Sequence, residues 1–324
     1  MKTIKIGLLG LGNIGTGTYK TLEMNRSEIE STLNAKVEIV KILERDTERD
    51  RGITVPKEKF TSDPDEIFQD PEIDIVIELL GGIEPATTFM LSALKNGKHV
   101  VTANKAALAA NYHELINTAK ENNVILRFEA SVGGGIPILG TLTGPLRANK
   151  FEEVMGILNG TTNYILTMMT KEGLDYETAL KDAQEQGFAE ADQTADVEGI
   201  DAANKLTILM ALMFDKYVAP KDIPTTGITE ITKEKIEEAR SNGCKIKLIA
   251  HAWRDENDEI KYEVRPMYIS ATHPLANINK EFNAVFVKGN AVDDVMFYGK
   301  GAGPLPTGSA VLGDVIDISM MILK

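Results

Sequence analysis

Short apolar runs alternate with longer stretches of helical periodicity in the first third of the sequence, and this alternation limits the possible folds more than any other feature. The apolar runs cover residues 4–9, 37–43, 73–79, 99–102 and 124–128, and the helix-like stretches cover residues 13–31, 85–96 and 104–122. Strands separated by helices are typical of βαβ units, in which helices cover both faces of a parallel sheet. The sequence therefore predicts a doubly wound parallel α/β domain over residues 1–132.

The pattern changes after the three consecutive glycines that end at Gly135. Residues 136–148 and 161–214 favour helices, whereas residues 154–158, 246–253, 260–270, 284–287 and 295–298 favour strands. The polar segment 255–259 is typical of a hairpin turn. We therefore expect an α+β domain over residues 133–306 that binds substrate, carries catalytic residues and forms a homodimer or a dimer of dimers. Residues 307–324 resume helical periodicity, which predicts a C-terminal helix packed on the first domain.

Charge and cysteine content exclude several classes of partner. The 324 residues include 35 basic and 48 acidic side chains, a net charge of −13, which would repel nucleic acid. Cys244 is the single cysteine, so it forms no internal disulfide, and we expect a cytoplasmic protein. The longest wholly apolar run is Ile208–Phe214, well short of the ~18 residues that span a bilayer, so no membrane span is expected. Small molecules are the expected partners.

A glycine-rich turn follows the first apolar run and opens the first helix-like stretch, in the order Gly10, Leu11, Gly12, Asn13, Ile14, Gly15. Such a turn lets the backbone approach a pyrophosphate, which the N–H groups of the helix N-terminus then bind. In this βαβ context it predicts a Rossmann-type domain that binds NAD or NADP. Glu44, at the end of the second run, favours the ribose hydroxyl of NAD, whereas Arg45 favours the 2′-phosphate of NADP. Both coenzymes stay open, with NADP as the preferred hypothesis.

Three further residues stand where strands of the predicted sheet end. Gly81 follows the third strand, Thr102 is the last residue of the fourth, and Lys105 follows the fourth. The carboxyl ends of parallel strands face the ligand crevice, so we expect these residues near the coenzyme. The alternative for Lys105 is an ordinary residue in the first turn of a solvated helix, although a cation is slightly unfavourable there.

An acidic segment precedes an apolar helix in the second domain. Residues 190–201 contain five acids and no base, which suits either a solvated loop or carboxylates that meet a cation. Asp201 and Lys205 are spaced i,i+4 and so share a face at the start of that helix. The helix is apolar nearly all round, which indicates burial, so the pair is either an ordinary ion pair or a proton donor group.

Two other motifs have both structural and functional interpretations. The segment Asn159–Tyr164 follows a predicted strand and suits either helix capping or binding of a substrate carboxylate. Glu129 precedes the glycines at 133–135, where carbonyl oxygens and a carboxylate suit a cation, or the glycines serve as a flexible hinge.

Eight ordered segments give the chain a family resemblance along nearly its whole length: it resembles homoserine dehydrogenase. The segments are Gly10–Gly15, Thr102–Lys105, Glu129–Pro137, Asn159–Leu166, Gly187–Asp192, Asp196–Ala203, Thr272–Asn277 and Tyr298–Gly303. The resemblance implies reversible reduction of L-aspartate 4-semialdehyde to L-homoserine with NAD(P)H, within the biosynthesis of threonine, methionine and isoleucine. Phe188 departs from the family, which usually has tyrosine there. The chain ends soon after Asp314, so feedback inhibition through an ACT domain is not expected.

The resemblance also implies roles for individual residues. Lys205 looks like the proton donor, with Lys105 as a second candidate. The remaining carried-over positions are Glu190, Asp201, Asp196, Gly160 and Thr161 for the substrate, Gly301 and Gly303 for the nicotinamide, and Glu129, Val132, Gly134 and Ile136 for sodium. Two alternatives are an aspartate-semialdehyde dehydrogenase that uses Cys244 as its nucleophile, and an NAD(P)-binding sensor without catalytic activity.

Overall fold

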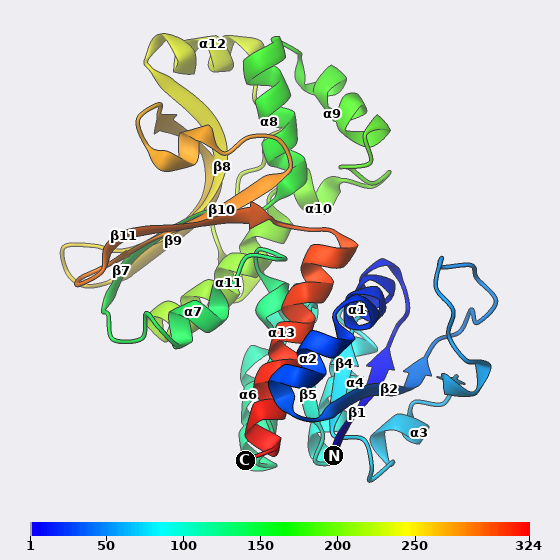
Figure 1. Ribbon diagram of the computed structural model, residues 1–324. Coiled ribbons are helices and arrows are strands. Elements are labelled where there is room, and N and C mark those ends of the chain that lie inside the picture. Colours follow the sequence, from blue (N-terminus) through cyan, green and yellow to red (C-terminus); the bar gives the residue numbers. More distant parts are fainter. Residues whose placement is uncertain (1) are drawn as a thin grey trace. The chain divides into compact units, whose positions relative to one another are not determined.

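The computed structural model describes residues 2–324, which divide into two compact units. One unit contains the chain up to Gly135 together with Ala302–Lys324, and the other contains Ile136–Gly301. Figure 1 shows both units, coloured along the sequence, with most of their helices and strands labelled. The C-terminal segment therefore belongs to the same unit as the N-terminal strand.

The first unit contains a six-stranded, wholly parallel sheet in the order β3-β2-β1-β4-β5-β6. Its strands are β1 (Thr3–Leu9), β2 (Lys36–Leu43), β3 (Phe60–Thr61), β4 (Ile75–Glu78), β5 (His99–Thr102) and β6 (Leu126–Arg127). Its helices are α1 (Asn13–Met24), α2 (Arg26–Leu33), α3 (Asp65–Phe68), α4 (Ala86–Lys95), α5 (Lys105–Ala110), α6 (Tyr112–Glu121) and α13 (Pro304–Ile322), with 3₁₀ turns η1 (Lys57–Lys59) and η2 (Glu129–Ser131). This strand order is that of a doubly wound dinucleotide-binding fold, as predicted.

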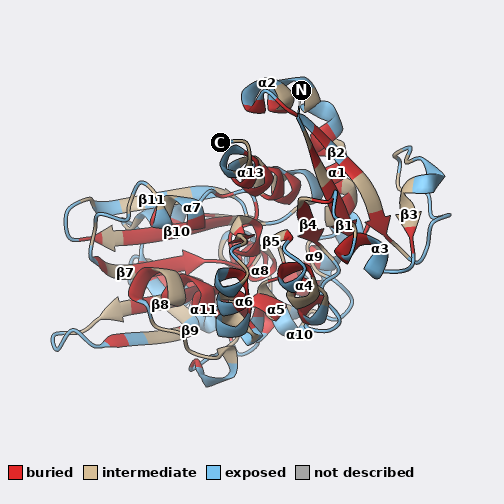
Figure 2. Cartoon of the chain, turned by 90° about the horizontal axis from the view of Figure 1, so that it is seen from below, coloured by how far each residue is buried: buried red, intermediate tan, exposed pale blue. Residues whose placement is uncertain are grey.

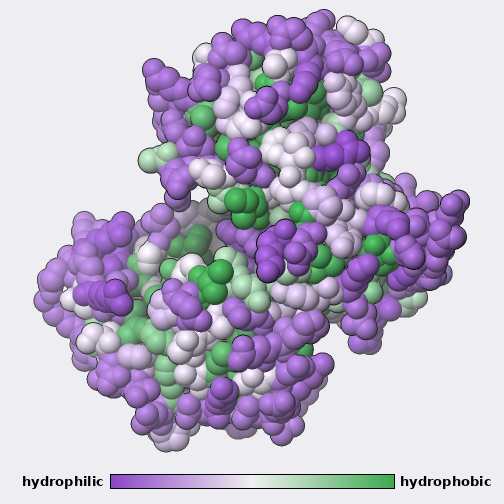
Figure 3. All heavy atoms as spheres, turned by 180° about the vertical axis from the view of Figure 1, so that it is seen from behind, coloured by the Kyte–Doolittle hydropathy of each residue, from purple (hydrophilic) through white to green (hydrophobic). Residues whose placement is uncertain are grey.

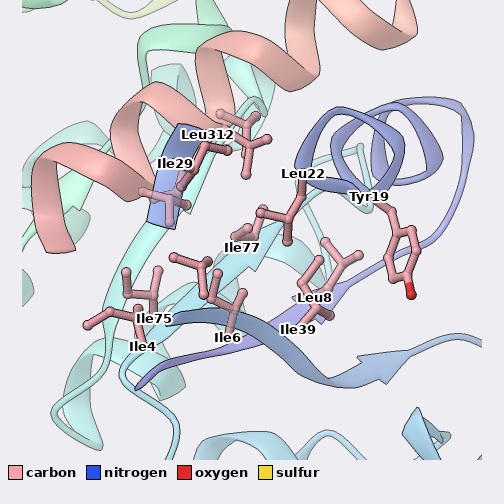
Figure 4. Packing of buried hydrophobic residues seen from close by; sticks show 14 of the residues in the cluster. Ile4, Ile6, Leu8, Tyr19, Leu22, Ile29, Ile39, Ile75, Ile77 and Leu312 are labelled. Atoms are coloured by element: carbon pink, nitrogen blue, oxygen red, sulfur yellow. The ribbon is translucent and has the colours of Figure 1, made fainter. Parts of the chain in front are cut away.

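One hydrophobic cluster of this unit lies between the sheet and the helices α1, α2 and α13. Ile4, Ile6 and Leu8 alternate along β1 and point toward Leu22 of α1 and Leu312 of α13 (Figure 4). Helix α13 is also the one helix among residues 2–324 that is long and apolar enough to cross a membrane. Part of its apolar character is accounted for by side chains such as Leu312 that are buried in this core, whereas others such as Met321 are exposed.

The second unit contains a five-stranded antiparallel sheet in the order β11-β10-β7-β8-β9. Its strands are β7 (Phe151–Ile157), β8 (Cys244–Arg254), β9 (Ile260–Ser270), β10 (Phe282–Gly289) and β11 (Asp293–Lys300). Its helices are α7 (Leu139–Thr143), α8 (Gly160–Glu172), α9 (Tyr176–Glu185), α10 (Thr194–Val197), α11 (Ile200–Phe214) and α12 (Lys233–Ser241), with 3₁₀ turns η3 (Pro220–Asp222) and η4 (Pro274–Asn277). Strands β7 and β10 are mostly buried, whereas β11 is more exposed (Figure 2). The predicted hairpin joins β8 and β9.

The structure differs from the sequence-based expectation in several places. The stretches 13–31 and 104–122 are each two helices, and α3 and α12 were not expected. The two-residue strand β3 was not predicted, because a two-residue strand leaves no alternating pattern. The helix expected over residues 136–148 covers only Leu139–Thr143, since prolines and glycines interrupt the segment on both sides. The long helical stretch over 161–214 is four helices, and glycines at positive φ end α8 and precede α11.

The surface is mainly hydrophilic on the face drawn in Figure 3, with hydrophobic residues in separate small areas. This agrees with the acidic composition and net charge of −13.

Candidate functional site

The glycine-rich turn between β1 and α1 has the geometry that a dinucleotide requires. Gly10 has a φ of +93°, a conformation that favours glycine. A Cβ at Gly15 would overlap the Gly10 carbonyl oxygen, whereas a Cβ at Gly12 would meet no heavy atom within 4 Å. The backbone of Gly15 therefore packs directly on Gly10, whereas the space beside Gly12 is open. Helix α1 begins at this point, and no side chain caps its first N–H groups. Such an open helix N-terminus fits a pyrophosphate.

The carboxylate of Glu44 is engaged by the protein itself at the end of β2. Its Oε2 accepts a 3.0 Å hydrogen bond from the Leu11 N–H, and its Oε1 accepts from the backbone N–H of Arg45 at 2.8 Å. The guanidinium of Arg51 lies 3.2 Å from Glu44 Oε2 and donates to the Leu11 carbonyl at 2.7 Å. Arg51 was missed by the sequence reasoning, since nothing in its run of charged neighbours distinguishes it.

A buried carboxylate connects the loops after β4 and β5. Glu78 is fully buried, and its Oε2 accepts a 2.7 Å hydrogen bond from Thr102 Oγ1. Burial raises the pKa of Glu78 above its ordinary value. Thr102 Oγ1 also accepts from the Asn104 N–H, and Asn104 caps α5, whose first residue is Lys105. The loop that follows β4 contains Gly81, which has a φ of +80°. Asn104 Nδ2 donates to the Gly82 carbonyl at 2.7 Å, which holds the loop of Gly81 beside the start of α5.

In the second unit, the spacing of Asp201 and Lys205 produces a buried ion pair at the start of α11. Lys205 Nζ lies 2.6 Å from Asp201 Oδ2 and donates to the Leu158 carbonyl at 2.6 Å. Lys205 is 8% exposed and Asp201 is 7% exposed, so solvent screens the pair little. The end of β7 and the first turns of α11 therefore hold the amine in one place.

Asn159 joins this pair to the acidic segment. Its Nδ2 donates to Asp201 Oδ2 at 3.0 Å and to Asp196 Oδ1 at 2.6 Å, while its Oδ1 caps α8 by accepting the Thr162 N–H. Thr161 Oγ1 lies 3.0 Å from Asp196 Oδ2. The sequence reasoning treated Asn159 as a cap or a carboxylate-binding group, and its position beside two carboxylates was not predicted.

The segment 187–193 contacts the first two turns of α8 through Phe188. The Phe188 carbonyl lies 2.7 Å from Thr161 Oγ1, and the Phe188 ring packs on Tyr164 with centroids 4.7 Å apart. The Tyr164 hydroxyl donates to Asp182, and burial together with that carboxylate raises the pKa of Tyr164 to about 12. Glu190 lies in an exposed stretch of this segment, and the hydrogen bond described for it uses its backbone carbonyl.

Gly160, the first residue of α8, packs against chain backbone. A Cβ there would lie 2.8 Å from the Glu281 carbonyl oxygen, so a larger residue would force the two segments apart.

The residues carried over for a cation lie around the glycine segment. Glu129 is in η2, its N–H donates to the buried Asp314 carboxylate, and burial is the main cause that raises the pKa of Asp314 to about 7. Val132 and Ile136 are buried, and Gly134 has a φ of +57°. Among residues 2–324, no group of three or more His, Cys, Asp or Glu side chains is arranged to hold a metal ion. A cation at this place would therefore need backbone oxygens in addition to a carboxylate such as that of Glu129.

The two other glycines of the resemblance lie near the junction with α13. A Cβ at Gly301 would overlap the Asn283 side chain, and Gly303 has a φ of +125°. Both positions therefore favour glycine for local steric reasons.

Comparison with known proteins gives a consistent result. Residues 137–316 match the model of the homoserine dehydrogenase family, and residues 10–129 match the model of its NAD-binding domain. The homoserine dehydrogenase of Bacillus subtilis is 45% identical over 318 residues, which cover 98% of this chain and 73% of the relative. A crystal structure of the enzyme from Thiobacillus denitrificans has a TM-score of 0.96 at 42% identity and covers 99% of this chain and 74% of that one. A hyperthermophilic archaeal homoserine dehydrogenase in complex with NADPH has a TM-score of 0.83 at 25% identity, with 98% of both chains covered.

Proposed function

The chain belongs to the homoserine dehydrogenase family, and from that premise we propose which of its residues carry out the reaction of this NAD(P)-dependent oxidoreductase. The reaction is the reversible reduction of L-aspartate 4-semialdehyde to L-homoserine. When bound, the reduced nicotinamide supplies a hydride to the aldehyde carbon.

Lys205 is the proposed proton donor to the aldehyde oxygen. Negative charge develops on that oxygen as the carbonyl is reduced, and a fixed cation stabilises the charge before transferring its proton. The observation that supports this role is the double anchoring of Lys205 Nζ by Asp201 and the Leu158 carbonyl, each at 2.6 Å. In the reverse direction the neutral amine accepts the proton of the alcohol. Lys105, at the start of α5, is the second candidate.

The acidic segment is proposed to bind the amino end of the substrate. Glu190, Asp196 and Asp201 would neutralise the α-ammonium group. Residues 190–201 contain five acids and no base, so this segment suits a cationic ligand. Gly160 and Thr161, at the N-terminus of α8, would contact the remaining polar groups of the substrate.

For the coenzyme, the proposed ligands lie in three groups. The turn contributes Gly10, Gly12, Asn13, Ile14 and Gly15, the strand ends contribute Gly81, Thr102 and Lys105, and Gly301 and Gly303 would lie by the nicotinamide. NADP is proposed in preference to NAD. Because Glu44 already accepts from Leu11 and lies beside Arg51, it is less suited to a ribose hydroxyl, whereas Arg45 suits a 2′-phosphate.

Four further parts of the proposal concern the setting of the enzyme. A sodium ion would be held by Glu129 and by backbone oxygens of Val132, Gly134 and Ile136. Its charge would stabilise the ionised forms of Glu129 and of the buried Asp314. A homodimer or dimer of dimers would form through the sheet of the second unit. The cytoplasm is the proposed location, since a single cysteine is typical of a reducing compartment. The product would enter threonine, methionine and isoleucine biosynthesis.

Replacing Lys205 by alanine tests the central assignment. We expect turnover of L-homoserine to fall by roughly 10²–10⁴-fold, while NADPH binding, followed by its fluorescence, stays within about twofold. Lys181→Ala, at an exposed position of α9, is the matched control and should keep normal turnover. Near-normal turnover of Lys205→Ala would contradict the proposed role.

A further inference from the structure

A second buried lysine, distant in sequence from the proposed catalytic groups, has no part in the chemistry described above. Lys247 lies in the middle of β8 and is 2% exposed. Its Nζ donates to Asn163 Oδ1 at 2.9 Å and to the Ile278 carbonyl. Both acceptors are neutral oxygens, and burial, with smaller contributions from Lys245 and Lys171, lowers the pKa of Lys247 to about 7. Burying a lysine away from any carboxylate costs free energy of folding, so this residue is expected to have a role beyond filling space in the core.

Asn163 connects Lys247 to the backbone of residues 278–282. It lies in the first turn of α8 and is 2% exposed. Its Nδ2 faces three carbonyl oxygens of the segment 278–282, those of Ile278 at 3.3 Å, Lys280 at 2.9 Å and Phe282 at 3.1 Å. Because Lys247 holds the Oδ1 of the same amide, the amide cannot turn over without losing these contacts.

One turn further along α8, Thr167 adds a contact to the same segment. Its Oγ1 accepts the Lys280 N–H at 3.0 Å and donates to the Asn163 carbonyl at 2.6 Å. Lys280 has a φ of +56°, an uncommon conformation for a residue other than glycine, so these contacts also hold the backbone in an unfavourable shape.

The held segment lies directly against the proposed substrate-binding turn. A Cβ at Gly160 would come within 2.8 Å of the Glu281 carbonyl, so the first residue of α8 and residue 281 are in close contact. The position of segment 278–282 therefore determines the position of Gly160 and, through it, of Thr161.

We propose that Lys247 and Asn163 are positioning residues, which fix residues 278–282 against Gly160 and thereby set the geometry of the substrate-binding turn. This inference rests on the proposed function in so far as Gly160 and Thr161 contact the substrate. It assigns no contact with substrate or coenzyme to Lys247 itself.

Steady-state kinetics of Lys247→Met test the proposal. Methionine keeps the length of the side chain and loses its donors. We expect the KM for L-homoserine to rise about tenfold, as the loss of buried hydrogen bonds predicts, with the KM for NADP unchanged. A general loss of folding would instead lower kcat and leave both KM values unchanged. Lys261→Met, at an exposed position of β9, is the control and should leave both KM values unchanged.

A milder variant covers the case in which Lys247→Met does not fold. Thr167→Val keeps the shape of the side chain and removes its hydroxyl, which accepts the Lys280 N–H and donates to the Asn163 carbonyl within α8. We expect a rise of about threefold in the KM for L-homoserine. Hydrogen exchange at residues 160–162 and 278–282 should become faster in each folded variant, a readout that does not depend on activity. Loss of homoserine oxidation by the unmodified protein would refute the proposed function alone. Unchanged exchange in these segments, or an unchanged homoserine KM in a folded variant of an active enzyme, would overturn the positioning role.

Discussion

Replacing Gly308 by alanine tests how closely α13 packs on α1 in the coenzyme-binding unit. An added Cβ at Gly308 would lie 2.8 Å from the backbone nitrogen of Thr18 and 2.9 Å from the carbonyl carbon of Gly17. In the opposite direction, a Cβ at Gly17 would overlap the Pro304 carbonyl. Backbone atoms cannot rotate away as a side chain does, so the two helices must move apart to admit the methyl group (Figure 1).

Two opposing terms set the size of the effect. Overpacking costs about 1–3 kcal/mol, while alanine in place of glycine within a helix stabilises by up to ~1 kcal/mol. We therefore expect Gly308→Ala to lower the free energy of unfolding by about 1–2 kcal/mol. For a unit of this size that corresponds to a fall of roughly 2–8 °C in the melting temperature.

Gly313 in the same helix provides the matched control. A Cβ at Gly313 would meet no heavy atom within 4 Å, and the residue is exposed. Gly313→Ala should therefore keep only the helical gain and raise the melting temperature by roughly 2–4 °C. Thermal unfolding followed by circular dichroism of both variants measures the difference. If Gly308→Ala proves as stable as Gly313→Ala, the close packing of α13 on α1 is refuted.

Three other outcomes follow from the structure. The pKa of Lys247 is lowered to about 7 from 10.5, so the unfolded chain binds more protons between these pH values, and stability gains as pH rises through that window. Between pH 7 and 9 the unmodified protein should gain about 2 kcal/mol relative to Lys247→Met, measured by urea unfolding with Trp253 fluorescence, and a pH-independent difference would contradict this. Arg51→Met should raise the KM for NADP about tenfold without changing that for L-homoserine, because it releases the loop that follows β2; an unchanged coenzyme KM would argue against it. Asn159→Asp keeps an oxygen that caps α8 but replaces the donor to Asp196 and Asp201 by a third carboxylate, itself buried, so kcat/KM should fall about a hundredfold and the melting temperature should fall as well, more at pH 8 than at pH 5, where protonation relieves the repulsion. Retention of full activity would show that the amide is not needed.

The parallel sheet was predictable because short strands rich in isoleucine, valine and leucine alternate with helix-like stretches, although only the inner strands such as β4 are buried on both faces and β2, nearer the sheet edge, begins with alternating exposed and buried residues. The expected runs at residues 4–9, 37–43 and 99–102 correspond to β1, β2 and β5, with ends within one residue. Periodicity reports only on segments long enough to repeat, which is why the two-residue strand β3 was missed. The helix expected over 136–148 is shorter than predicted because the periodic pattern continues past Pro137 and Pro145, where the helix cannot.

The candidate site divides in the same way between local and distant contacts. The pairing of Asp201 with Lys205 follows from i,i+4 spacing on one helix, so the sequence alone brings the two groups together. The contacts of Asn159 with carboxylates 37 and 42 residues away depend on how β7, α10 and α11 pack, which no local pattern reports.

Glu44 shows how a distant contact changes the meaning of a local signal. A carboxylate at the end of the second strand indicates a ribose ligand when only the spacing from the glycine turn is considered. In the folded chain, the same carboxylate accepts the Leu11 N–H, 33 residues away, and lies 3.2 Å from Arg51. The Glu44 carboxylate therefore stabilises the glycine-rich turn itself, and the hydrogen bond from Arg51 to the Leu11 carbonyl connects that turn to the loop after β2. If Glu44 and Arg45 set the coenzyme preference as proposed, a substitution of Arg51 should change that preference even where Glu44 and Arg45 stay in place.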